Sequence, residues 1–304
     1  MRAWRALAFY LVWVFVGGAL LAPWLYWIAQ GLLEHSPVFH SLFQKLAGNP
    51  FHRFVNRSLL ALAFVGLWPL ARSLDIRSWS ELGLVRPNGQ GPRLVAGLLL
   101  GFASLAFVAL LTLAVGARGL NSEMTPDRLA RKLCTAAASA VVVALLEEVL
   151  FRGALFGGLR KACRWQLAMI VSSVLYASVH FFGRSGIHEE IRWTTGFTVL
   201  GQMLRGVVDV DQAIPGILNL TLAGALLAMA RQRTESLYFS IGLHAGWIFW
   251  LKSYGLLTRD AVGGSVSLWG SGRLIDGWLT LAVLACCWPA AMRLTTPGKP
   301  SAHG

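Results

Sequence analysis

The sequence predicts an all-α, polytopic membrane helix bundle with about eight transmembrane helices and one interfacial or re-entrant helix. The first observation is composition: 56% of the 304 residues are hydrophobic, only 13% are charged, and the mean hydropathy is +0.58. Such values are typical of membrane proteins. The second is that apolar segments of near-spanning length recur along the chain, separated by clusters of Arg, Pro and Gly.

Eight apolar segments are the predicted spans. They are Leu7–Ala29, Ser58–Ala71, Leu94–Ala117, Leu133–Leu159, Gln166–Phe182, Ile214–Ala230, Leu237–Leu251 and Gly277–Met292. The second and seventh are shorter than the roughly 20 residues that a perpendicular span needs, so we expect them to use flanking residues. The first is too long for a signal peptide and lacks a small-residue cleavage site, which predicts a retained helix. The segment between Phe182 and Ile214 is too polar to span and too apolar for a plain loop, and its part Trp193–Val208 is predicted to be the interfacial or re-entrant helix.

The net charge of +13 is distributed over short loops between spans. No basic, aromatic-rich domain that could bind nucleic acid is present, so anionic lipids are the predicted partner. The positive-inside rule predicts a cytoplasmic N-terminus in a multi-pass cell membrane protein, with a bacterial inner membrane as the expected location. The loops then predicted to be cytoplasmic carry Arg2, Arg5, Arg72, Arg77, Arg86, Arg93, Arg160, Lys161, Arg164, Arg231, Arg233, Arg293 and Lys299.

The stretch LLEEVLFRG places Glu147, Glu148 and Arg152 inside a run that is otherwise apolar from Leu133 to Phe156. A carboxylate at the centre of a spanning helix costs about 2.5–3.5 kcal/mol on insertion scales, so these groups must be paired or face a wet cavity. Glu148 and Arg152 are four residues apart in the favourable order for a helical ion pair. Glu147 lies about 100° around the helix and is available for chemistry. A purely structural ionic lock between helices is the alternative.

Two histidines lie on other membrane segments, His180 in SSVLYASVHFFG and His244 in SIGLHAGWIFW. One intramembrane histidine is usually a hydrogen-bonded packing residue, but two histidines together with the Glu147–Glu148 pair favour a functional site. The helical rise of about 1.5 Å per residue places all these groups at depths from which they can converge. We therefore predict a common site within the membrane.

This set of residues resembles the CPBP intramembrane proteases, which include CAAX prenyl endopeptidases and bacteriocin-processing or immunity (Abi) proteins. The resemblance consists of E147-E148-x-x-x-R152, then Tyr176 and His180, then His244 in a later helix. It covers about residues 133–252, which would be the catalytic core between N-terminal helices in residues 1–132 and a C-terminal helix and tail in residues 253–304. The family implies an intramembrane endopeptidase that is similar to the CAAX prenyl protease.

Two positions depart from the family pattern. Tyr176 stands where Phe is common, which keeps the ring and adds a hydroxyl. Ile248 stands four residues after His244, where the family commonly has Asn or Asp. That residue is taken to help hold the oxyanion, and removing one such donor typically costs about 10²–10³ in rate. Asn219, Ser240 and the Trp247 indole are the candidate substitute donors.

The resemblance implies peptide hydrolysis by an activated water. Glu147 would be the general base, His180 would orient or share the proton, and His244 would stabilise the oxyanion. No cofactor is required in this mechanism; zinc held by Glu147, His180 and His244 is the alternative, although the H-E-x-x-H motif is absent. A membrane peptide or protein is the expected substrate. The competing hypothesis is a catalytically inactive family member that acts as a membrane scaffold or bacteriocin immunity factor.

Overall fold

The computed structural model describes residues 2–35, 44, 47–180, 190–205, 210–261 and 266–296. These residues fold into two compact units, one made of Met1–Asp75 with His180–Val210 and the other of Ile76–Val179 with Asp211–Gly304. The predicted segment boundaries after residues 132 and 252 are placed by the extent of the family resemblance, which is a different criterion from the compactness that defines these two units. These boundaries stay a prediction.

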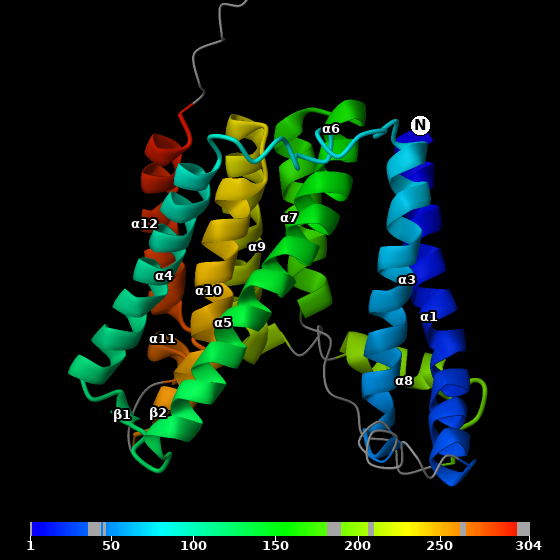
Figure 1. Ribbon diagram of the computed structural model, residues 1–304, viewed down its shortest axis with the longest axis horizontal. Helices are drawn as coiled ribbons and strands as arrows, with labels where there is room; N and C mark the ends of the chain where they lie inside the picture. Colours follow the sequence, from blue (N-terminus) through cyan, green and yellow to red (C-terminus); the bar gives the residue numbers. More distant parts are fainter. Residues whose placement is uncertain are drawn as a thin grey trace, which may run out of the picture. The chain divides into compact units, whose positions relative to one another are not determined.

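The first unit contains two long helices and a short one. Helix α1 spans Arg2–His35, α3 spans Phe51–Ser73 and α8 spans Thr195–Arg205. Figure 1 shows α1 and α3 side by side and antiparallel, with α8 lying across them. The Tyr10 hydroxyl on α1 donates to the Ala63 carbonyl on α3 at 2.9 Å. Helix α8 lies within the predicted Trp193–Val208 segment, whose last three residues fall outside the described part of the chain.

The second unit carries the remaining described helices. They are α4 (Gly91–Ala114), α5 (Pro126–Glu148), the π-helix η2 (Val149–Phe156), α6 (Gly157–Ala162), α7 (Trp165–His180), α9 (Val210–Thr234), α10 (Tyr238–Leu257), α11 (Val266–Trp269) and α12 (Trp278–Leu294). Strands β1 (Arg118–Leu120) and β2 (Thr258–Asp260) pair antiparallel, with Arg118 opposite Asp260. A buried apolar core joins α4, α9, α10 and α12. Figure 1 shows these helices running along one another.

Five helical stretches among the described residues are long and apolar enough to cross a membrane. They are Trp4–Leu33, Phe51–Ser73, Gly91–Ala114, Pro126–Ala162 and Ile214–Thr234, and the shorter Trp278–Leu294 is also apolar. The predicted all-α, multi-pass membrane fold is therefore confirmed, whereas eight as the number of spans stays a prediction. The two short predicted segments do use flanking residues, since α3 begins at Phe51 and α10 ends at Leu257.

Helices α4 and α10 are in backbone contact at glycine positions, where a Cβ atom would not fit. Each carries a G-x-x-x-G pattern, Gly97–Gly101 on α4 and Gly242–Gly246 on α10. A Cβ atom at Gly101 would lie 2.1 Å from the Leu243 carbonyl oxygen, and one at Gly242 would lie 2.0 Å from the Leu94 carbonyl oxygen. Small residues allow this backbone contact, which drives helix association in lipid. His244 lies between the two α10 glycines, so this contact fixes its helix.

We expect Gly101→Ala to reduce the yield of folded protein sharply. The added methyl group would overlap backbone atoms of α10 that cannot move independently, and overpacking of this kind costs about 1–3 kcal/mol or more. The measurement is the monodisperse fraction and thermal midpoint of the purified protein. The matched control is Gly31→Ala on α1, where an added Cβ meets nothing within 4 Å; equal loss in both variants would contradict the close-contact explanation.

Candidate active site

Glu148 is the centre of a buried polar cluster in the second unit. It is the last residue of α5, and its side chain is 0% exposed. Its Oε1 atom accepts a hydrogen bond from Arg152 Nη1 at 3.0 Å and another from His244 Nδ1 at 2.9 Å. A buried carboxylate is tolerated only when it is paired and hydrogen-bonded in this way. The ion pair predicted from the four-residue spacing is therefore present.

Arg152 lies in the π-helix that continues α5. Seven consecutive residues of this segment, Leu150–Phe156, are buried. The second guanidinium nitrogen of Arg152 donates to the Gly224 carbonyl of α9 at 3.4 Å. A Cβ at Gly224 would lie 2.9 Å from that of Ser173 on α7, so glycine permits α7, α9 and Arg152 to meet. π-Helical turns are rare and frequently occur at functional sites.

The contact with Glu148 determines the tautomer of His244. His244 is 3% exposed on α10. An ionised carboxylate paired with arginine can only accept hydrogen bonds, so His244 Nδ1 carries a hydrogen. In the neutral ring, Nε2 is therefore the acceptor. The Tyr176 hydroxyl lies 3.1 Å from Nε2 and is positioned to donate to it.

Glu147 lies near the other ring nitrogen of His244. Its Oε2 atom lies 3.6 Å from His244 Nε2. The Glu147 side chain is 24% exposed, whereas that of Glu148 is 0% exposed. Of the two carboxylates, Glu147 thus belongs to the less buried side chain, although its Oε2 atom beside the imidazole is itself buried.

Tyr176 is the aromatic residue that precedes His180 in the family-like pattern, where Phe is common, and the structure places it in the cluster. It lies on α7, 3% exposed. The Arg152 guanidinium lies over its ring, 4.3 Å from the centroid, and the Phe151 ring packs edge-on against it at 5.1 Å. Such cation–π and T-shaped contacts fix the ring orientation. The hydroxyl is therefore held against His244.

His180 is the last residue of α7 and is exposed. It follows Tyr176 by four residues, which places both on one face of this helix. It belongs to the unit formed by Met1–Asp75 and His180–Val210. Its convergence with Glu147 remains a prediction.

The three candidate substitute donors already donate to other groups. Asn219 Nδ2 donates to the carbonyls of Ile275 and Gly277, at 2.7 and 3.0 Å. Ser240 Oγ donates to the Leu227 carbonyl at 3.1 Å, and Trp247 Nε1 donates to Ser104 Oγ at 3.0 Å. Each would have to break these hydrogen bonds to reach an oxyanion, so their proposed role remains a prediction.

Ile248 packs on α5 rather than on a polar group. It is 7% exposed within an apolar cluster that includes Ala140, Ala144, Ile241 and Ala245. The position where the family commonly has Asn or Asp is therefore filled by aliphatic contacts between α5 and α10. No polar hydrogen is available from this residue.

A small cavity of about 30 Å³ lies beside the cluster. Tyr176, His244 and Trp247 line it together with apolar side chains of α4, α9, α10 and α12. This volume is close to that of one water molecule in the liquid. Tyr176 and His244 therefore face a space that one small group can occupy.

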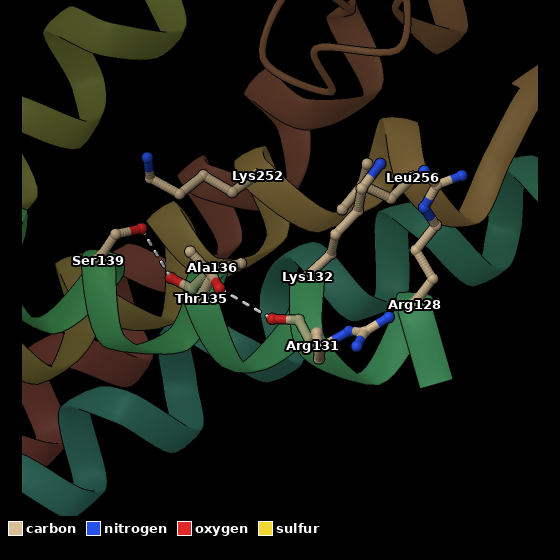
Figure 2. A pocket seen from close by; sticks show the side chains of 8 residues that line it. All are labelled: Arg128, Arg131, Lys132, Thr135, Ala136, Ser139, Lys252 and Leu256. Atoms are coloured by element: carbon tan, nitrogen blue, oxygen red, sulfur yellow. Dashed lines mark hydrogen bonds between the residues drawn. The ribbon is translucent and has the colours of Figure 1, made fainter. Parts of the chain in front are cut away.

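A separate basic groove of about 440 Å³ lies between the N-terminal part of α5 and the C-terminal part of α10. It is lined by Arg128, Arg131, Lys132, Thr135, Ala136, Ser139, Lys252 and Leu256. Figure 2 shows Arg128 and Lys132 reaching from α5 toward Leu256. Arg131 forms an exposed ion pair with Asp127 at 2.8 Å. The other three cations are Arg128, Lys132 and Lys252. No acidic residue of the described part of the chain lines the groove with them, so the groove is positively charged.

The described residues do not fit the zinc alternative. No group of three His, Cys, Asp or Glu side chains among them is placed to hold a metal ion. Glu148 Oε1 and His244 Nδ1 are hydrogen-bonded to each other, so neither of these two atoms is available as a ligand. We therefore derive no step through a metal.

Residues 130–250 match the model of a protein family described as type II CAAX prenyl endopeptidase Rce1-like. This match confirms the resemblance to the CPBP proteases and covers α5 through most of α10. No curated protein and no solved structure matches the chain.

Proposed function

We propose that the protein is an intramembrane endopeptidase similar to the CAAX prenyl protease. The match of residues 130–250 to the Rce1-like family of type II CAAX prenyl endopeptidases supports this proposal. The observation that carries the proposal is the cluster of Glu147, Glu148, Arg152, Tyr176 and His244. It combines a partly exposed glutamate side chain, an adjacent imidazole and a buried ion pair that contacts the imidazole. This is the arrangement that general base catalysis requires.

In the proposed reaction Glu147 accepts a proton from a water molecule. The water oxygen bonds to the scissile carbonyl carbon, and the electron pair of the C=O double bond moves onto the carbonyl oxygen. When this tetrahedral species collapses, the double bond re-forms, the C–N bond breaks, and the proton passes to the leaving nitrogen. His180 is proposed to orient or share that proton, and His244 is proposed to stabilise the oxyanion. This mechanism needs no metal.

Glu148 and Arg152 are proposed to act as positioning residues. Glu148 holds His244 through Nδ1, and Arg152 holds Glu148 and the Tyr176 ring. Outer contacts of this kind set the tautomer and orientation of a working histidine. The cluster therefore gives a role to all three ionisable groups of LLEEVLFRG.

A cleavage screen in membranes of the host tests the proposal. Membranes containing the wild type or Glu147→Ala are compared for new peptide termini in membrane proteins and in added prenylated and unprenylated peptides. We expect termini that depend on Glu147. If the wild type produces none with any peptide, the inactive scaffold or immunity alternative is favoured, for which the aliphatic Ile248 is the supporting observation.

Anionic lipids are proposed to bind the basic groove between α5 and α10. Arg128, Arg131 and Lys132 lie at the start of the candidate span Pro126–Ala162, the depth at which lipid headgroups are found. The groove is at the opposite end of this span from Arg160 and Lys161, which the sequence assigns to the cytoplasmic side. An N-terminus in the cytoplasm and a bacterial inner membrane complete the proposed location.

We expect the combined change Arg128→Gln, Lys132→Gln and Lys252→Gln to weaken retention of phosphatidylglycerol. Each basic residue near a charged surface contributes about 1 kcal/mol, so three changes remove most of the attraction. Native mass spectrometry counts the phosphatidylglycerol and phosphatidylcholine molecules retained. The matched control neutralises Arg86, Arg164 and Arg293, which are exposed and do not line the groove; an equal loss there would contradict a specific groove.

A further inference from the structure

Position 248 lacks the polar donor that the oxyanion needs, and the structure offers another group within the same cluster. Ile248 is enclosed by aliphatic side chains, and the polar hydrogens of Asn219, Ser240 and Trp247 are directed to other acceptors. The Tyr176 hydroxyl is the neutral donor that contacts His244 directly, at 3.1 Å.

We propose that the Tyr176 hydroxyl is a catalytic residue of this site and donates a hydrogen bond to the oxyanion together with His244. The inference rests on the proposed peptidase function and adds one group to it. It assigns chemistry to the hydroxyl that distinguishes this chain from relatives with phenylalanine at the same place.

The hydrogen-bond roles in the cluster permit this function. Glu148 fixes the hydrogen of His244 on Nδ1, so in the neutral ring Nε2 accepts from Tyr176. When His244 is protonated, Nε2 becomes a donor, and the tyrosine hydrogen can be directed to a new acceptor. Two donors, Nε2–H and the tyrosine O–H, then lie about one hydrogen-bond length apart. That spacing is the one at which both can reach a single oxygen atom.

Position also favours the hydroxyl. Tyr176 and His244 line the 30 Å³ cavity, which has room for about one water molecule or a carbonyl oxygen. The Arg152 guanidinium lies 4.3 Å from the centre of the Tyr176 ring, where it offsets part of the negative charge of Glu147 and Glu148. The ring itself is fixed between Arg152 and Phe151.

Tyr176→Phe tests the inference, because it removes one oxygen atom and keeps the ring contacts. We expect kcat for a substrate found in the cleavage screen to fall by about 10²- to 10³-fold, the usual cost of one oxyanion donor, with KM nearly unchanged. The matched control is Tyr254→Phe on α10, whose buried hydroxyl bonds to Thr112 Oγ1 at 2.7 Å outside the cluster. This control should keep kcat within a few-fold of wild type.

Three outcomes would overturn the inference in distinguishable ways. Full kcat in Tyr176→Phe, while Glu147→Gln is inactive, removes Tyr176 from the mechanism and leaves the proposed function intact. An equal fall of kcat in Tyr176→Phe and Tyr254→Phe shows that any lost buried hydroxyl has this effect. Absence of cleavage by the wild type overturns the proposed function, and the inference with it.

Discussion

Glu147→Gln should abolish peptide cleavage while the protein still folds. The amide has the shape of the carboxylate but cannot accept a proton from water, and loss of a general base lowers the rate by about 10²- to 10⁴-fold. Folding should be little affected, because Glu147 is the partly exposed member of the pair and lies 3.6 Å from His244, outside the Glu148–Arg152 contact. Cleavage rate and folded yield are the two measurements.

Glu148→Gln is the control for that variant. The two glutamates are adjacent in sequence, and the substitutions are chemically identical, so only their positions differ. In Glu148→Gln the ion pair with Arg152 and the acceptor for His244 Nδ1 are weakened, so we expect chiefly a lower folded yield. The reverse result, inactivity in Glu148→Gln and a folding loss in Glu147→Gln, would exchange the roles of the two residues.

Arg152→Leu should be the most destabilising single change in the cluster. It leaves the Glu148 carboxylate, 0% exposed, without its cation, and breaking a buried ion pair in this way costs about 3–5 kcal/mol. It also removes the hydrogen bond to Gly224 and the contact with the Tyr176 ring. We expect the thermal midpoint and the monodisperse fraction to fall together.

The matched control is Arg131→Leu, on helix α5, which the π-helix with Arg152 continues. Arg131 and Asp127 form another ion pair with four-residue spacing, but their side chains are 76% and 68% exposed. Exposed helical pairs contribute only about 0.3–0.5 kcal/mol, so this change should be nearly neutral. If the two leucine variants lose similar stability, burial of Glu148 and Arg152 is not what makes their pair important.

Most helices could be predicted from the sequence because an apolar run long enough to span lipid has few alternatives to a helix. The ends were less predictable. Helix α3 begins seven residues before the predicted Ser58 because its first turns contain polar residues, among them Arg53 and Arg57, that an apolar run excludes. The close contact of α4 with α10 had a visible signal, the two G-x-x-x-G patterns, that the prediction did not use.

Part of the candidate site followed from spacing alone. The Glu148–Arg152 pair required only that both residues lie on one helix. The contacts of His244 with Glu148 and Tyr176 depend on how α5, α7 and α10 are rotated about their axes, which a single sequence does not determine. The signal for Tyr176 was its added hydroxyl at a place where the family commonly has Phe, but its significance depended on the 3.1 Å distance to His244.

The π-helix at Val149–Phe156 is a place where the helix can lose one residue. A ring closed from residue i to i+5 contains one residue more than the α-helical ring. Loss of one residue here would therefore restore regular α-helical bonding. Because the wider turn accommodates the extra residue, this loss would leave Glu147 and Glu148 facing nearly the same way relative to the residues that follow. A relative with a regular helix at this place would thus align with a single gap, and its acidic pair would keep its neighbours.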